Sequence, residues 1–208
     1  GSELIATVIP VLNEEDFIGL CLDSLIHQTM ESSNHMILVL DGGSSDRTVQ
    51  CVESAAKRSY EIDGPRIELH TNPGKHVAEA RNLALTLLPS TVHYMIELIG
   101  HSTVPTDHLE VRLKEWKRIE SLDDGALGAV GVRVESRRGN LGVFEGWVEG
   151  CLQSPFGSGS GQFSRFKVAG VTQTPAFCMH SRAVIEDVGG WNPSFITSQD
   201  SDLSMRLS

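Results

Sequence analysis

The chain has no excess of positive charge. Its 27 Asp and Glu outnumber its 17 Lys and Arg, which gives a formal net charge of −10 at pH 7. Nonspecific binding to nucleic acid or to an anionic lipid surface needs clustered basic side chains that displace counterions. We therefore expect no nucleic-acid partner, and an anionic ligand has to be held locally by backbone amides, a few basic side chains or a metal.

Cysteine pairs and long hydrophobic runs are missing as well. Cys21, Cys51, Cys151 and Cys178 form no CxxC pair, so we interpret them as buried thiols of a reducing, cytoplasmic compartment rather than as disulfides or metal ligands. No stretch approaches the roughly 18 apolar residues of a membrane span, and no basic-then-apolar pattern opens the chain. Neither a membrane span nor a signal peptide is predicted.

The glycine-rich phosphate motifs of two large nucleotide-binding classes are also absent. Neither GxGxxG nor GxxxxGK[ST] occurs in a suitable setting, which excludes the dinucleotide-binding and P-loop classes. With 40% hydrophobic and 21% charged residues, the chain is typical of one globular α/β domain over residues 1–208. It stops at Ser208 inside a predicted helix. We therefore expect a missing C-terminal extension, and any membrane-associating segment to lie there.

Apolar runs and helical patterns alternate through the first half of the chain. The first run ends at Pro10, which cannot donate to a central ladder, and Asn13 is a suitable N-cap for the helix that follows. Similar strands are predicted around 36–40, 66–70 and 93–99, with helices between them. This order predicts a Rossmann-like, mostly parallel central sheet with right-handed crossovers and helices on both faces.

The second half of the chain is less regular. The predicted elements are a helix at 107–119, a strand at 127–134, a helix at 144–152, a Gly/Ser-rich loop at 154–166, a strand at 175–179, a short helix at 181–190 and a last helix near the end. No linker divides them into a second domain.

The turns after the strands are expected to meet at one edge of the sheet, where open α/β folds bind their ligands. They are Pro10–Glu14, Asp41–Asp46, Asn72–His76 and Gly100–Thr103. Asp41, followed by two glycines, is suited to accept hydrogen bonds from a planar ligand edge. An aspartate in this position also commonly caps its own turn, so both interpretations stay open.

Two further segments carry candidate chemistry. In "NPGKHVAEARN", Lys75, His76 and Arg81 are suited to hold phosphate at a helix start, with a solvated helix face as the alternative. In "GGWNPSFITSQDSDLSMRL", Trp191 offers an aromatic face for stacking on a sugar ring, and Asp200 lies at a predicted helix start. Acidic residues there often act as N-caps, but in a cleft one could serve as a general base.

Four motifs in this order resemble those of the large second family of inverting glycosyltransferases with the GT-A fold. They are "VIPVLNEE", "LDGGSSDRT", "NPGKHVAEARN" and the final segment above, and together they span nearly the whole chain. Within that family, the resemblance is to bacterial and archaeal enzymes that build exopolysaccharides and glycolipid-linked chains. It implies transfer of a hexose from a nucleoside diphosphate-sugar donor to a glycan or lipid-linked acceptor. A membrane-associating segment beyond Ser208 would place this domain at the cytoplasmic face of a membrane.

The resemblance also implies site residues. Asp200 would deprotonate the acceptor hydroxyl in a single inverting displacement, and Trp191 would contact the acceptor. The residues implied to surround the donor are Pro10, Val11, Glu14, Asp41, Gly74, Lys75 and Arg81.

The metal motif of the family departs from its usual form in this chain. The Asp-x-Asp pair expected at the end of the fourth strand aligns with Ile99-Gly100-His101, and Gln199 replaces the acid usually found before Asp200. Isoleucine cannot bind a cation, and one imidazole suits Mn²⁺ better than Mg²⁺. His101 is therefore a weak metal ligand, its alternative being a local hydrogen bond or a diphosphate contact, and we expect weak or absent dependence on a divalent cation.

Two other functions compete with the glycosyltransferase hypothesis. The first is a non-catalytic GT-A domain that binds a nucleotide or a partner protein, having lost turnover together with the first metal ligand. The second is a nucleotidyltransferase that forms sugar nucleotides, but its first loop should be rich in glycine and arginine, which "PVLNEED" is not.

Overall fold

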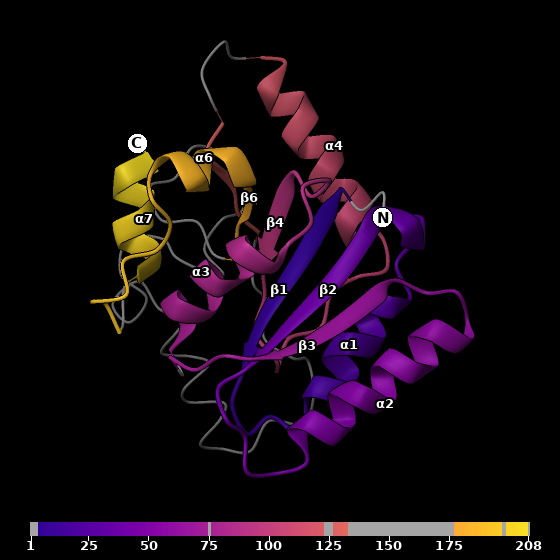
Figure 1. Ribbon diagram of the computed structural model, residues 1–208. Helices are drawn as coiled ribbons and strands as arrows, with labels where there is room; N and C mark the ends of the chain where they lie inside the picture. Colours follow the sequence, from indigo (N-terminus) through magenta and orange to yellow (C-terminus); the bar gives the residue numbers. More distant parts are fainter. Residues whose placement is uncertain (1–3, 75, 123–126, 133–176, 197–198, 208) are drawn as a thin grey trace, which may run out of the picture.

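A six-stranded sheet organises the part of the chain that the structure describes. This computed structural model describes residues 4–74, 76–122, 127–132, 177–196 and 199–207. The strand order is β3-β2-β1-β4-β6-β5 (Figure 1). The strands are β1 Ile5–Val11, β2 His35–Asp41, β3 Arg66–Thr71, β4 Tyr94–Glu97, β5 Ala129–Val130 and β6 Met179–Ser181. The first four are parallel, whereas β6 runs antiparallel to both β4 and β5.

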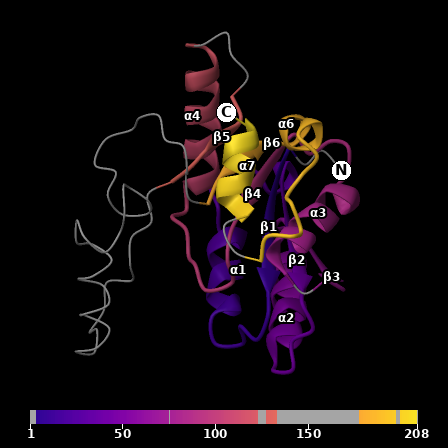
Figure 2. The same cartoon turned by 90° about the vertical axis from the view of Figure 1, so that its left-hand side faces the viewer.

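Helices cover both faces of this sheet, as predicted. They are α1 Ile18–Ile26, α2 Thr48–Glu61, α3 Val77–Leu87, α4 His108–Glu120, α6 Arg182–Asp187 and α7 Gln199–Leu207, with a 3-10 turn at Ser32–Asn34. Side chains of α3, α6 and α7 pack on one face of the sheet, and those of α1, α2 and α4 pack on the other. Figure 2, turned by 90°, shows α1 and α4 on one side of the strands and α3 on the other.

The central strands are hydrophobic without interruption because both of their faces are covered. In β1, Ala6 and Val8 pack under α3, while Ile9 and Val11 pack under α1. A strand buried on both sides shows no alternation of polar and apolar residues, which is typical of parallel sheets in α/β proteins. The edge strand β3 is half-buried to exposed along its whole length.

Two local predictions in the first turn are wrong. β1 continues through Pro10 to Val11. Its pairing with β4 ends at Val8, so at Pro10 the strand has only β2 as a neighbour. A proline is tolerated there because one side of the strand needs no N–H donor. Asn13 does not cap α1, which begins four residues later than predicted and after Phe17. Asn13 instead adopts a left-handed conformation with φ of 55°.

The second half confirms the elements that the structure describes. Within the described residues, β5 lies inside the strand predicted at 127–134, whereas β6 overlaps the strand predicted at 175–179 only at Met179 and continues to Ser181. The helix predicted at 144–152, the Gly/Ser-rich loop and Cys151 lie outside the described residues. Cys21 and Cys178 are buried thiols, as predicted, whereas Cys51 is half-buried. Within the described segments, no helix has the length and apolar character needed to cross a membrane.

Candidate active site

The turns after β1, β2, β3 and β4 meet at one edge of the sheet, as the alternation predicts. Val11 pairs with Asp41 at the ends of β1 and β2, and the Gly42 N–H donates to the Val11 carbonyl at 2.9 Å. The Asn72 N–H, after β3, donates to the Asp41 carbonyl at 2.7 Å. The backbone therefore fixes the spacing of this edge before any side chain contributes.

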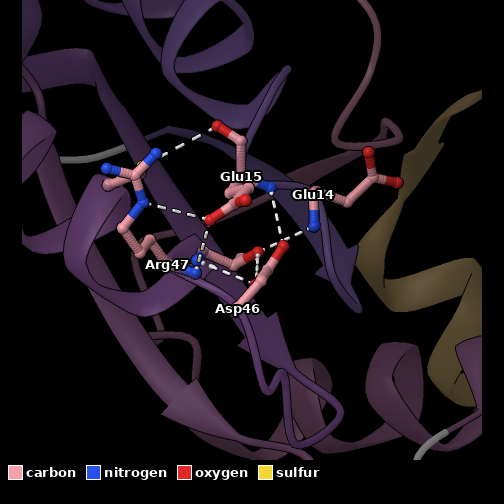
Figure 3. A network of polar contacts seen from close by, with 6 residues as sticks. Glu14, Glu15, Asp46 and Arg47 are labelled. Atoms are coloured by element: carbon pink, nitrogen blue, oxygen red, sulfur yellow. Dashed lines mark hydrogen bonds and ion pairs between the residues drawn. The ribbon is translucent and has the colours of Figure 1, made fainter.

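Side chains lock the first two turns together. Glu14 N–H donates to Thr48 Oγ1 at 2.7 Å, and Glu15 N–H donates to Asp46 Oδ2 at 3.1 Å. Arg47 closes the network, because its Nε and backbone N–H both donate to Glu15 Oε2, at 3.2 and 2.9 Å (Figure 3). These bonds satisfy the amides of the turn before α1, where no helical partner is available.

The conformation of Asn13 belongs to the same arrangement. Its backbone N–H donates to Ser44 Oγ at 2.9 Å, and its side-chain Oδ1 accepts from Ser45 N–H at 2.8 Å. An asparagine tolerates the left-handed region better than most residues and offers a short polar side chain. It therefore joins the β1–α1 turn to the β2–α2 turn instead of starting a helix.

Asp41 braces its own turn, which is the alternative that the sequence left open. It is 7% exposed, and its carboxylate accepts from the N–H groups of Gly43 and Ser44 at 3.1 Å. Gly43 has φ of 95°, a conformation for which glycine is suited. A contact between Asp41 and a ligand stays a prediction, as it does for the half-buried Pro10 and the buried Val11 beside it.

Glu14 faces His101 across the sheet edge. His101 Nδ1 donates to Glu14 Oε1 at 2.9 Å, and the His101 side chain is 54% exposed. The close approach depends on Gly100, where an added Cβ would lie 3.1 Å from the Glu14 side chain and 3.3 Å from Val11. Two residues predicted for different contacts, Glu14 for the donor and His101 for a metal, thus form one pair.

Arg81 does not lie on a solvated helix face, nor is it displayed toward solvent as a phosphate ligand. It is 4% exposed, its Nη2 lies 3.0 Å from Glu97 Oε2, and its Nη1 donates to Asp200 Oδ1. His76 is exposed at the start of α3, and Gly74 leaves room for the Glu79 side chain, which accepts from His76 N–H at 3.2 Å. Lys75 lies outside the described residues.

Asp200 and Glu97 share the Arg81 guanidinium. Glu97, the last residue of β4, is 3% exposed and also accepts from His180 Nε2 of β6 at 2.9 Å. Neither Glu97 nor His180 was predicted as a site residue. A signal for Glu97 exists in the sequence, since a charge inside the apolar run "YMIELI" requires a partner once it is buried. The sequence alone does not identify His180 as the partner of Glu97, because the two residues are 83 positions apart.

The pKa values of the two carboxylates that share this guanidinium are shifted in opposite directions. Burial alone raises the pKa of Glu97, but the charges of Arg81 and His180 outweigh it and the pKa is lowered. The pKa of Asp200 is raised, first by partial removal from water and then by the negative charge of Glu97, with Arg81 opposing both. Glu97 is therefore the permanent anion of the group, and Asp200 binds a proton more readily than an ordinary aspartate.

Trp191 is not an exposed stacking platform, which corrects its predicted use. The ring is 1% exposed and packs in the core beneath α3 and α7. The Arg81 guanidinium lies 5.7 Å from its centroid, and the His180 ring meets it edge-on at 5.9 Å. Trp191 thus supports the buried side of the cluster. Asp202, two residues after Asp200 in the first turn of α7, pairs with Arg206 at 2.7 Å.

Comparison with known proteins decides the family. The model of glycosyl transferase family 2 matches residues 7–189, which is most of the chain. The chain belongs to glycosyl transferase family 2.

Two relatives of this family 2 member cover nearly all of it. It is 29% identical over 203 residues to the succinoglycan biosynthesis protein ExoA of Rhizobium meliloti, covering 96% of this chain and 56% of that protein. It is 24% identical over 205 residues to a dolichyl N-acetyl-alpha-D-glucosaminyl phosphate 3-beta-D-2,3-diacetamido-2,3-dideoxy-beta-D-glucuronosyltransferase of Methanococcus voltae, covering 98% and 61%. The chain thus spans little more than half the length of these relatives.

Solved structures confirm the GT-A fold class. S. aureus TarS 1-349 in complex with UDP superposes with a TM-score of 0.70 at 16% identity, covering 98% of this chain and 54% of that one. The mannosyltransferase PcManGT of Pyrobaculum calidifontis, in complex with GDP-Man and Mn2+, gives a TM-score of 0.69 at 17% identity, covering 98% and 51%.

The metal position of this family 2 domain offers little to a cation. Ile99 contributes only its backbone carbonyl, which accepts from Cys21 Sγ at 3.7 Å. Among the described residues, no group of three His, Cys, Asp or Glu side chains is close enough to hold a metal ion. The protein ligand set at this strand end is one imidazole oriented by one carboxylate, which does not amount to a complete site.

Proposed function

We propose that this domain is an inverting glycosyltransferase in which Asp200 is the general base. The observation that carries the proposal is the place of Asp200: it lies in the first turn of α7, its side chain is 53% exposed, and Arg81 engages only Oδ1. Among the described residues, Asp200 Oδ2 accepts no hydrogen bond, and the proposal gives that oxygen to a substrate hydroxyl. A general base has to reach its proton directly, which an exposed carboxylate at the sheet edge is able to do.

The reaction is a single displacement. The acceptor oxygen forms a bond to the anomeric carbon of the donor, from the face opposite the diphosphate, while the bond from that carbon to the diphosphate oxygen breaks. The leaving diphosphate keeps the electron pair, and the hydroxyl proton moves to Asp200 Oδ2. Attack from the opposite face inverts the anomeric configuration. A raised pKa of Asp200 favours this transfer, because a base is most effective when its pKa lies nearer the working pH.

The donor lies, in this proposal, over the edge formed by the first two turns. Pro10, Val11, Glu14 and Asp41 border the base and ribose, and Gly74, Lys75 and Arg81 belong to the turn and helix beside it. The locked network of Figure 3 supports this placement, since a rigid edge positions a ligand with little loss of entropy. TarS is known in complex with UDP-GlcNAc and PcManGT with GDP-Man, which supports a nucleoside diphosphate-sugar.

The acceptor is proposed to be a hydroxyl of a glycan or of a lipid-linked saccharide. The names of the two relatives support this class, since one acts in succinoglycan biosynthesis and the other acts on a dolichyl phosphate-linked sugar. We assign no acceptor contact to Trp191, because its ring is buried.

A divalent cation, Mn²⁺ or Mg²⁺, is proposed to be only weakly held. His101 is the one side chain at the end of β4 suited to contact a cation that arrives with the donor diphosphate. Such a cation would offset charge on the leaving group. No step above depends on it.

Transfer assays with the full-length protein test the proposal. A panel of UDP-, GDP- and dTDP-sugars is incubated with and without Mn²⁺, and release of nucleoside diphosphate is followed. We expect Asp200→Asn to lower kcat by about 100-fold or more while donor binding is kept, because a general base contributes about that much. Asp202→Asn is the matched control on the same helix turn, and should stay within about threefold of wild type.

The non-catalytic alternative has one observation in its favour, which is the isoleucine at the metal position. It predicts that nucleotides bind without any turnover, whichever metal and sugar are supplied. That outcome in the full-length protein would replace the enzymatic proposal, as would full activity of Asp200→Asn.

A further inference from the structure

A chain of four polar side chains leads from the core to the sheet edge. His180 of β6 contacts Glu97 of β4, Glu97 contacts Arg81 of α3, and Arg81 contacts Asp200 of α7. The first three are 3 to 4% exposed, whereas the Asp200 side chain is 53% exposed. Four elements that are distant in sequence thus place one titratable group each in a single line.

Among these four side chains, Glu97 is held by contacts to both of its carboxylate oxygens and to its backbone N–H. Its backbone N–H donates to the Cys178 carbonyl at 2.9 Å, and its two carboxylate oxygens are taken separately, Oε1 by His180 at 2.9 Å and Oε2 by Arg81 at 3.0 Å. The side chain is buried, and these three contacts come from β6, from the residue before it and from α3. The position of the Glu97 carboxylate therefore does not depend on Arg81 alone, since His180 and the Cys178 carbonyl also hold this residue.

Arg81 depends on Glu97 for its orientation. A guanidinium presents its donors in a planar fork, so holding Nη2 on Glu97 determines where Nη1 points. Here Nη1 reaches Asp200 Oδ1, and the Trp191 ring below the guanidinium restricts its tilt. Without Glu97, Arg81 is free to rotate onto Asp200 with both nitrogens and occupy both carboxylate oxygens.

We propose that Glu97 is a positioning residue, which with His180 fixes Arg81 so that it engages only one oxygen of Asp200 and leaves the other for the acceptor hydroxyl. This inference rests on the proposed function, in which Asp200 is the base. It adds a residue that the motif pattern does not point to, and it explains why a carboxylate is buried at the end of β4.

The electrostatics of the same group gives a second consequence. The charged or titratable groups that interact with Asp200 from other elements are Arg81, Glu97, His180 and Cys178, and Asp202 and Arg206 lie on its own helix. Glu97 raises the pKa of Asp200 and Arg81 lowers it. Removing the Glu97 charge leaves Arg81 unopposed, so the pKa of Asp200 falls and it becomes a weaker base.

Glu97→Gln in the full-length protein tests the proposal. The change keeps shape and volume, and Arg81 keeps Asp200 as a partner, so no charge is left buried alone. We expect kcat to fall by about 10- to 100-fold, with donor Kd within about threefold of wild type. We also expect the acid limb of the kcat/KM profile to move to lower pH, because the charge that raises the pKa of Asp200 is removed. A purely structural change would lower activity equally at every pH and leave that limb in place.

Glu68→Gln is the matched control. Glu68 also lies on a strand between an arginine and a histidine, with Arg66 at 2.7 Å and His70 at 3.1 Å. It is on the edge strand β3, which β2 and β1 separate from β4, and it has no part in the proposed site. Its substitution should leave kcat and the pH profile as in wild type.

The outcomes separate this inference from the proposed function. If Asp200→Asn abolishes transfer while folded Glu97→Gln matches wild type in kcat and in pH profile, the inference alone fails. If wild-type protein transfers no sugar, the proposed function fails first and takes the inference with it. Should Glu97→Gln not fold, Glu97→Asp keeps the charge but withdraws the carboxylate by one methylene. Lowered kcat with unchanged donor Kd then supports the inference, and unchanged kcat overturns it.

Discussion

At the scale of single residues, His101 shows how one contact changes the chemistry of a side chain. Its Nδ1 donates to Glu14 Oε1, so in the neutral ring the lone pair is left on Nε2. Metal-binding histidines commonly have this arrangement, in which a carboxylate fixes the tautomer and turns the free nitrogen outward. With Ile99 two residues earlier, no carboxylate ligand accompanies it at this strand end.

The imidazole of His101 at this position predicts a preference for Mn²⁺ over Mg²⁺. We expect Mn²⁺ to stimulate transfer more than Mg²⁺, because nitrogen ligation suits Mn²⁺ and Mg²⁺ prefers oxygen. His101→Ala should remove most of that difference, whereas His27→Ala, an exposed histidine at the end of α1, should leave it intact. The measurement is the initial rate with each metal and after chelation. An equal Mn²⁺ preference in wild type and His101→Ala would count against His101 as a ligand.

At the scale of elements, the two glycines after α6 determine the path of the chain toward α7. Gly189 and Gly190 have φ of 82° and 75°, so both lie in the left-handed region. Trp191 follows them directly, and its backbone pairs with the side chain of Asn82 on α3. Asn82 Nδ2 donates to the Trp191 carbonyl at 2.7 Å, and Asn82 Oδ1 accepts from the Trp191 N–H at 2.9 Å. An added Cβ at Gly190 would lie 2.5 Å from Asn82 Oδ1, whereas one at Gly189 would meet nothing within 4 Å.

The two glycines form a matched pair for a stability measurement. Gly189→Ala should cost about 1–2 kcal/mol of unfolding free energy, which is the penalty for a side chain in the left-handed region. Gly190→Ala should cost at least about 1 kcal/mol more, because the methyl group displaces the Asn82 amide from the Trp191 backbone. Urea unfolding of both variants measures the difference. Equal losses would show that the Asn82 contact contributes nothing.

At the scale of the whole molecule, buried histidines make stability depend on pH. His35 of β2 is 1% exposed, with Nε2 3.0 Å from Thr7 Oγ1 of β1, and burial, followed by the charge of His108, lowers its pKa to about 3. His108, half-buried at the start of α4, also has its pKa lowered to about 3, by partial removal from water and then by the charge of Arg112. In the unfolded chain both pKa values return to about 6.5.

The sign of this dependence follows from proton counts. Between about pH 6.5 and 3 the unfolded chain binds more protons than the folded protein, so the stabilisation present above pH 6.5 is lost as the pH falls. We expect the unfolding free energy to drop between pH 7 and pH 5 by on the order of 1–2 kcal/mol per buried histidine. His35→Leu should reduce the drop, and His27→Ala should not. Stability that is equal at both pH values would contradict this prediction.

Much of the fold could be predicted from the sequence because its signals are local. An apolar run such as 36–40 between turn residues has few alternatives to a buried strand, and strands that alternate with helices have few alternatives to a parallel sheet. The place of Pro10 and Asn13 could not be predicted this way. Both depend on a neighbouring strand or turn, which is about 30 residues away for Asn13 and more than 80 for Pro10.

The candidate site divides along the same line. By itself the sequence determined the family motifs, the turns that meet at the sheet edge and the absence of an acid at Ile99, because these are properties of residue type and order. Only the tertiary structure decided that Trp191 is buried, that Arg81 faces two carboxylates, and that Glu97 and His180 belong beside Asp200. The reason is that a buried charge requires partners, and the choice of partner is made by the packing of distant elements.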